Sequence, residues 1–338
     1  RTAELLDLIV CAMYVRRYTT PKLKLQAMDM VERIHKEMVK LLSKIDWMDE
    51  TTRKEALSKA HTMAFHVAYP AELLDDKELE KYYEKVELGS DYFDSVTKIN
   101  TFLNPYEFSL LKKPYNKTDW RTHGNTHAVN AFYNPSENSI ELPAGILRNP
   151  FFSPDRPSYL NYGAIGYIIA HEMTHAFDDE GRQYDKDGNL FDWWQKETTR
   201  LYEDKAKQII QEYSNFTVQE INMKMKGVNT QGENIADQAG AKIAYTAYIK
   251  RASRFKEEER LPNFLNYTSN QMFWISAGHS WCTKYRPETL RYLVKTGNHP
   301  PAEYRVNGPF RFSKYFARDF SCPKDSFMNP SEKHNVWR

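Results

Sequence analysis

The segment His171-Glu172-Met173-Thr174-His175 constrains this chain of 338 residues more than any other stretch. Histidines four residues apart leave the same face of an α-helix, so both imidazoles can bind one metal ion. Glu172 would then lie beside the coordination position that is left for water. This H-E-x-x-H spacing is typical of zinc-dependent hydrolases. Because five residues can match a pattern by chance, the prediction depends on a third ligand and on groups that orient the histidines.

Glu233 is the candidate for the third ligand. A longer pattern with a third histidine would need glycine at 178 and histidine at 181, and Asp178 and Gly181 exclude it. Glu233 opens a second predicted helix, whose apolar face includes Ile235, Ala239 and Ile243. Two histidines and one carboxylate leave a fourth position for water, which is the composition of a catalytic rather than a structural zinc site.

Two further carboxylates are placed to orient these ligands. Asp178 follows His175 by three residues and can accept a hydrogen bond from the second nitrogen of that ring. Asp237 follows Glu233 by four residues on the same helix face and can serve His171 in the same way. A lone aspartate usually lies on a solvated helix face, but four acidic residues on two ligand-bearing helices favour a metal site.

The composition predicts a globular chain with no preference for nucleic acid. Apolar residues make up 41% and aromatic residues 14%, which excludes a disordered chain. Lys and Arg number 47 against 45 Asp and Glu, so a net charge of +2 provides no strongly basic surface. No apolar run approaches the roughly 18 residues that cross a bilayer. The chain begins at Arg1 without a signal-peptide pattern, so we expect a mature or excised piece, with any anchor or signal outside it.

Cysteines and glycosylation sequons favour a secretory route. The odd set Cys11, Cys282 and Cys322 is either three buried thiols or part of a disulfide framework with partners outside this chain. Asn-x-Thr sequons, which support the second alternative, occur at Asn116, Asn215 and Asn266.

The N-terminal third is expected to be helical. Across residues 1–70, apolar side chains recur every three or four positions from Leu25 to Ile45, and Asp49 is the expected N-cap of a further helix that Pro70 ends. Residues 71–125 are charged and read as an irregular boundary. Three histidines of the helical region lack ligand spacing and are expected to be structural or exposed: His35, His61 and His66.

A β-hairpin and a buried helix are expected ahead of the metal motif. Residues 128–133 and 139–142 read as strands, and Asn, Pro and Ser at 134–138 form the turn between them. Small and aliphatic residues at 162–170 predict a buried helix that leads into His171.

Several of these stretches together resemble the neprilysin and endothelin-converting-enzyme family of zinc metallopeptidases. The resemblance extends through nearly the whole chain and is weaker before residue 128. The matching motifs lie at 129–133, 142–147, 161–163, 171–179, 232–237, 281–287 and 336–337. The resemblance implies a mainly α fold with a small β-sheet (α+β): a thermolysin-like zincin catalytic domain at 101–338, and at 1–100 a helical region that is part of a lid domain and linker.

The resemblance also implies a role for each matching residue. His171, His175 and Glu233 would bind one zinc ion, with Glu172 as general base. Asp178 and Asp237 would orient the histidines. His299 would stabilise the oxyanion. The residues implied to bind the substrate are Asn130 and Ala131 on an edge strand, Arg305 on a substrate carbonyl, and Ile146, Phe151, Tyr167, Ile168, Ser280 and Trp281 around the S1′ pocket.

The chain departs from the family in lacking the N-terminal half. The three cysteines match family positions whose disulfide partners lie in that half, so the resemblance implies that half as a disulfide-linked partner. An oligomer or a larger complex is a further expected assembly. His334 and Gln208 occupy the two positions of a further family disulfide, so that bridge is absent as a pair. The expected location is extracellular, either secreted or as the ectodomain of a single-pass membrane protein.

These features are compatible with three functions. The first is a gluzincin-type endopeptidase that cleaves oligopeptides on the amino side of large hydrophobic residues. The second is a non-catalytic family member that serves as a binding or structural subunit of a larger extracellular complex. The third is a helical scaffold with a chance H-E-x-x-H. Intact ligands and an intact base favour the first.

Overall fold

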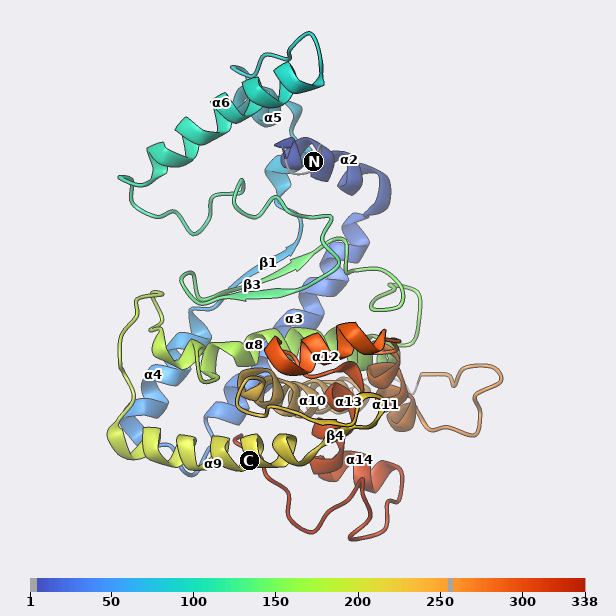
Figure 1. Ribbon diagram of the computed structural model, residues 1–338. Helices are drawn as coiled ribbons and strands as arrows, with labels where there is room; N and C mark the ends of the chain where they lie inside the picture. The colour runs from blue at the N-terminus through green and yellow to red at the C-terminus, as the bar shows by residue number, and fades with distance from the viewer. Residues whose placement is uncertain (1–4, 255–257, 338) are drawn as a thin grey trace.

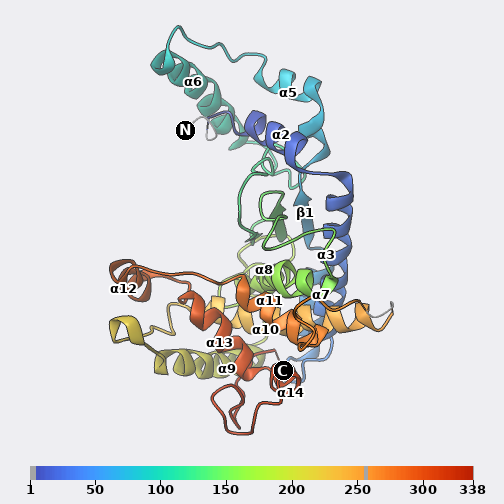
Figure 2. The same ribbon diagram turned by 90° about the vertical axis from the view of Figure 1, so that its right-hand side faces the viewer.

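Helix α3 (Pro21–Leu42) connects the two parts of the molecule in the computed structural model, which describes residues 5–254 and 258–337. It runs from an upper helical part to the larger lower body (Figures 1 and 2). Thr20 caps it by accepting a hydrogen bond from the Leu23 amide at 3.2 Å. Its buried face includes Ile34, but Leu25 is 70% exposed, so the predicted stripe is wrong there. Leu25 lies about two and a half turns before Ile34, on the opposite side of the helix.

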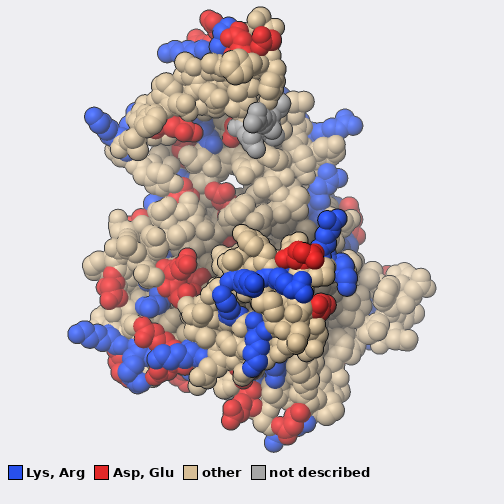
Figure 3. Space-filling view, in the orientation of Figure 1, with Lys and Arg blue, Asp and Glu red and all other residues tan. Residues whose placement is uncertain are grey.

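The other helices divide between these two parts. In the upper part are α2 (Asp7–Tyr18), α5 (Asp76–Tyr83) and α6 (Tyr92–Leu110). The lower body contains α4 (Glu50–His61), α7 (Ser158–Asn161), α8 (Tyr167–Thr174), α9 (Lys196–Asn215), α10 (Gln231–Ala252), α11 (Ser269–His279), α12 (Pro287–Thr296), α13 (Ala302–Phe312) and α14 (Lys314–Asp319). Acidic and basic side chains are both spread over the face shown in Figure 3. None of the described helices combines the length and apolar character needed to cross a bilayer.

The prediction of an irregular segment at 71–125 is wrong, because α5 and α6 lie within it. Asp75 and Asp91 cap these helices by accepting hydrogen bonds from the amides of Lys77 and Asp94, both at 2.9 Å. The charged residues that suggested a loop are therefore helix caps and exposed faces. Pro105 within α6 further obscured the helix in the sequence.

A three-stranded sheet joins segments that are far apart in the chain. Strand β1 (Ala64–Ala68) pairs in parallel with β3 (Ser139–Pro143), and β2 (Phe132–Asn134) pairs antiparallel with the other side of β3. The predicted hairpin is thus confirmed. The helical prediction for 1–70 is wrong at β1, because the strand is stabilised by pairing with residues some 75 positions away.

The hairpin is shorter than predicted. Strand β2 begins at Phe132, so Asn130 and Ala131 precede the edge strand rather than lie on it. A separate two-stranded ribbon pairs β4 (Thr217–Val218) with β5 (Met223–Lys224).

Helices α8 and α10 form the buried centre of the lower body. Gly240 lets them approach closely, since a Cβ there would lie 2.9 Å from the His171 backbone nitrogen. Residues Tyr162–Gly166 form a π-helical turn directly before α8. Such turns are frequent at functional sites.

The cysteines and the glycosylation sequons differ in their exposure to solvent. Cys11 is buried, where its Sγ accepts a hydrogen bond from the Thr126 amide at 3.3 Å, whereas Cys282 is exposed and Cys322 is half-buried. Their disulfides to another chain segment stay predictions. His334 Nδ1 lies 3.1 Å from Gln208 Oε1, so a hydrogen bond occupies the positions of the absent family bridge. The sequon residues Asn116, Asn215 and Asn266 are all exposed.

Candidate active site

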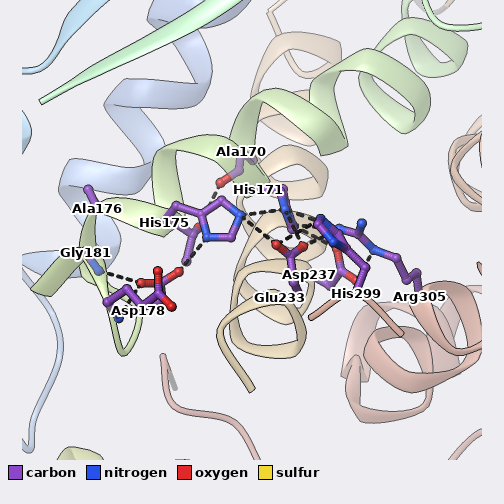
Figure 4. Close-up of polar contacts among 12 residues, drawn as sticks. Ala170, His171, His175, Ala176, Asp178, Gly181, Glu233, Asp237, His299 and Arg305 are labelled. Carbon is purple, nitrogen blue, oxygen red and sulfur yellow. Dashed lines mark hydrogen bonds and ion pairs between the residues drawn. The ribbon is translucent and has the colours of Figure 1, made fainter. Parts of the chain in front are cut away.

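The H-E-x-x-H segment lies where α8 passes into the 3₁₀ turn His175–Phe177. His171 and His175 turn their Nε2 atoms towards each other, 2.9 Å apart. Glu233, in the first turn of α10, places its two carboxylate oxygens 3.2 Å from His171 Nε2 and 3.6 Å from His175 Nε2 (Figure 4). The three predicted ligands are therefore brought together by the packing of α10 against α8.

The donor set fits a divalent metal such as zinc. All three donor atoms lie within 4.8 Å of one another. Glu233 Oε2 is buried and has no well-aligned hydrogen bond among the described residues, although cationic groups approach it as ion pairs. A bound cation would satisfy that oxygen and separate the two facing imidazole nitrogens.

Two aspartates hold the histidines from behind. Asp178 Oδ2 lies 2.5 Å from His175 Nδ1, and its Oδ1 accepts hydrogen bonds from the amides of Glu180 at 3.0 Å and Gly181 at 2.7 Å. Asp237 Oδ1 lies 2.9 Å from His171 Nδ1. Each ring therefore donates its Nδ1 proton to a carboxylate and directs Nε2 to the common centre.

The charges around His171 favour its protonation without a metal. Burial alone would lower the pKa of His171, but the charge and hydrogen bond of Asp237, with Glu233, raise it to about 10. Burial would likewise raise the pKa of Glu233, but hydrogen bonds from His171 and His299 hold it well below its usual range. A metal ion that binds here must displace a proton from the histidines.

Arg305 of α13 joins the site through a contact that no sequence spacing suggested. Its guanidinium binds Asp237 in a bidentate manner, with Nε and Nη2 each 2.9 Å from a carboxylate oxygen. Nη2 also lies 3.1 Å from Glu233 Oε2, and the guanidinium stacks over Trp281 at 4.1 Å from the ring centre. The resemblance implied a contact between Arg305 and a substrate carbonyl. The structure adds a link from Arg305 to Asp237, the carboxylate that contacts His171 Nδ1.

His299 lies on the segment between α12 and α13 and reaches the same centre. Its Nε2 is 3.1 Å from Glu233 Oε1, and its side chain is 54% exposed. Its Nδ1 lies 2.8 Å from Asn298 Oδ1. Both ring nitrogens therefore have partners, and the exposed imidazole lies where a ligand that enters from solvent would meet it.

A cavity of about 500 Å³ opens beside these residues. Glu172 lines it and is half-buried. Every residue predicted to bind the substrate also lines it: Asn130, Ala131, Ile146, Phe151, Tyr167, Ile168, Ser280, Trp281 and Arg305. Sequence reasoning did not single out Val129, Phe132, Tyr133 and Pro135 as pocket residues, although three of them lie in or beside a recognised motif.

Tyr167 has a different environment from the other pocket residues. Its ring lies at the cavity wall, but its hydroxyl is buried and donates a hydrogen bond to the backbone oxygen of Arg305 at 3.1 Å. The ring therefore limits the pocket, while the hydroxyl holds α13 against α8.

Comparison with known families identifies the chain. Two models, each described as Peptidase family M13, match residues 130–336 and residues 1–70. The chain belongs to peptidase family M13. It is 47% identical over 333 residues to Neprilysin-2 of Drosophila melanogaster and 37% identical over 326 residues to endothelin-converting enzyme 1 of Mus musculus. These alignments cover 98% and 96% of this chain.

The M13 chain also resembles solved structures over its whole length. The crystal structure of the Mycobacterium tuberculosis zinc metalloprotease ZMP1 in complex with inhibitor superposes with a TM-score of 0.85 at 29% identity, over 100% of this chain and 50% of that one. The predicted mainly helical zincin fold is thereby confirmed. The M13 chain spans 43% of Neprilysin-2 and 42% of the mouse enzyme, so less than half the length of those relatives.

Proposed function

We propose that this chain is the catalytic part of a zinc-dependent endopeptidase that acts on oligopeptides. The observation that carries the proposal is the cluster of His171, His175 and Glu233 at the wall of a peptide-sized cavity that Glu172 also lines. A zinc ion bound by these three residues would act as a Lewis acid and lower the pKa of a water molecule to about 7.

Side chains of this chain would carry out the other catalytic steps. Glu172 would take a proton from the attacking water and deliver it to the leaving amine. His299 would donate a hydrogen bond to the oxygen on which negative charge develops. Asp178 and Asp237 would keep both ligand histidines in the required tautomer.

Substrate binding would use the sheet edge and the apolar wall. Strand β2 is the outer strand of the order β1-β3-β2, so its free edge can pair with an extended peptide. Such a peptide would also pass Asn130 and Ala131, which directly precede the strand. Contacts to the peptide backbone tolerate many sequences. Apolar side chains including Ile146, Phe151 and Trp281 would select a large hydrophobic residue after the scissile bond, with Arg305 holding the carbonyl beyond it.

The decisive test is Glu172→Gln, with zinc content measured in parallel. We expect the variant to keep its zinc and to lose at least a hundredfold in kcat, because the amide cannot accept the proton. Peptides with Phe, Leu or Asp after the scissile bond would report the pocket preference. Equal cleavage by wild type and variant would reject the mechanism. Zinc binding without peptide hydrolysis by the full-length protein would instead support a non-catalytic binding subunit.

The remaining proposals concern the longer protein. We propose that an N-terminal half completes the cleft, that Cys11, Cys282 and Cys322 form disulfides with it, and that the assembly is extracellular and glycosylated at the exposed sequons. Mass analysis of the full-length protein with and without reduction and deglycosylation tests this. Three free thiols in the native protein would reject the linkage.

A further inference from the structure

A second group of two histidines and one glutamate lies in the sheet region. His66 comes from β1, His123 from the segment between α6 and β2, and Glu137 from the turn between β2 and β3. The imidazole rings stack with centres 3.5 Å apart and planes inclined by 11°. Their Nε2 atoms both approach Glu137 Oε2, at 4.0 Å from His66 and 3.8 Å from His123. We propose that these three residues bind a second zinc ion.

His123 is oriented in the same way as the two active-site histidines. Its Nδ1 lies 2.8 Å from Glu141 Oε1, so the ring donates that proton and directs Nε2 away from Glu141. This repeats the pairing of a carboxylate with Nδ1 seen at His171 and His175. The backbone oxygen of Lys117 accepts a hydrogen bond from His123 Nε2 at 3.3 Å, and zinc binding would replace that proton.

Glu137 is a buried carboxylate that requires a positive partner. It is 3% exposed, and hydroxyl groups of Ser139, at 2.7 Å, and Tyr115 donate to its two oxygens. Hydroxyl donors orient a carboxylate but do not neutralise it. In the described part of the chain, the recorded ion-pair contacts of Glu137 are with His66 and His123 alone. A cation beside Glu137, either an imidazolium or a metal ion, would balance the charge of its carboxylate.

His66 provides a nitrogen suited to a metal. Its Nε2 is buried without a hydrogen-bond partner among the described groups. This unpaired nitrogen lies 4.0 Å from Glu137 Oε2, so a cation between the two atoms would contact both. A cavity of about 270 Å³ lies beside the cluster and is lined by His66, His123 and Glu141. None of its lining residues belongs to the wall of the active-site cavity.

The donor types and spacings favour zinc. Imidazole and carboxylate ligands bind zinc at about 2.0–2.2 Å, which places tetrahedral ligands about 3.4 Å apart. The present separations of 3.8 and 4.0 Å require a closure of about half an ångström together with a rotation that opens the parallel rings. The ion would link β1, the segment between α6 and β2 that carries His123, and the turn between β2 and β3. It would thereby stabilise the sheet next to Asn130 and Ala131.

Zinc stoichiometry tests the proposal without relying on peptidase activity. The proteins are the wild type, a His66→Gln/His123→Gln variant, an active-site His171→Gln/His175→Gln variant, and a control His61→Gln at an exposed position of α4. Each is equilibrated with zinc, freed of unbound metal, and measured by inductively coupled plasma mass spectrometry. We expect two zinc ions in the wild type and the control, and one in each double variant.

Two results would overturn the second site. One is equal zinc content in the wild type and the His66→Gln/His123→Gln variant, and the other is an active-site variant free of zinc. Circular dichroism shows whether each variant is folded. If a double variant is not folded, Glu141→Gln in the wild-type background tests the second site instead. We expect it to weaken one of two zinc dissociation constants by 10–100-fold in chelator competition, and an unchanged pair of constants would reject the site.

Discussion

Lys59 links helix α4 to the segment that follows the metal motif, and its removal should destabilise both. Lys59 is 1% exposed, and its ammonium group donates hydrogen bonds to the backbone oxygens of Ala176 at 2.9 Å, Gly181 at 2.7 Å and Tyr184 at 2.6 Å. Lys59→Met keeps the aliphatic volume but removes one hydrogen bond from each of three buried acceptors. The oxygens of Gly181 and Tyr184 keep one other donor each, the Tyr184 amide at 3.1 Å and Trp193 Nε1 at 3.0 Å. Hydrogen bonds from charged groups contribute about 1.5–3 kcal/mol each, and the desolvation penalty of the buried ammonium, which Met avoids, offsets part of their sum. We therefore expect a loss of about 3–5 kcal/mol in the free energy of unfolding.

Urea unfolding followed by circular dichroism measures this loss, with Lys54→Met as the matched control. Lys54 lies on the same helix but is exposed, so its replacement should change the free energy of unfolding by less than about 0.5 kcal/mol. Zinc affinity should also fall in Lys59→Met, because the same segment carries Asp178. A loss below about 1 kcal/mol with unchanged zinc affinity would refute the argument.

The pH dependence provides an independent check on Lys59. Burial lowers its pKa to about 7, against the opposing charges of Asp178 and Asp185. The native pKa is thus below the unfolded value of about 10.4, and the unfolded chain binds more protons between these two values. The contribution of Lys59 to stability therefore rises with pH across this window. We expect the difference in unfolding free energy between wild type and Lys59→Met to grow from pH 7 to pH 9, and a constant difference would contradict the shifted pKa.

Two further substitutions address the loop behind His175. Asp178→Asn should weaken zinc binding by about 10–100-fold, because an amide holds the Nδ1 proton less strongly, and chelator competition measures the change. Gly181→Ala should reduce the free energy of unfolding by more than about 2 kcal/mol, since its Cβ would lie 1.8 Å from the His175 backbone oxygen. Thermal unfolding checks this, with Gly278→Ala as control, where a Cβ meets only a Val306 methyl carbon at 3.6 Å. Equal effects of the two alanines would contradict the steric argument.

The cluster proposed to bind zinc was predictable because much of its geometry is local. Spacings of four between His171 and His175, and of three between His175 and Asp178, place side chains on one helical surface whatever surrounds the helix. The position of Glu233 at the start of an amphipathic helix was also visible. The hairpin was recognisable from its turn residues. Its first strand was predicted too long, because Asn130 and Ala131 lie in a strand-like sequence but do not pair with β3.

Contacts between residues far apart in the sequence could not be predicted from local spacing. Strand β1 was mistaken for helix because its five residues are extended only through pairing with β3. His66 was expected to be structural or exposed, since nothing in its spacing indicates that it stacks on His123 and faces Glu137. The bidentate pair of Arg305 and Asp237 likewise joins residues on two helices that the sequence separates by 68 positions.

The amino-acid sequence alone determined the ligand types, their spacing on each helix and the resemblance to a peptidase family, because these depend on residue identity and helical periodicity. Only the tertiary structure decided how α10 meets α8, which closes the cluster of His171, His175 and Glu233. It also decided that Lys59 supports the loop behind that cluster and that a second histidine pair converges on Glu137. The physical reason is that such contacts result from packing between distant segments, and packing is a property of the whole folded chain.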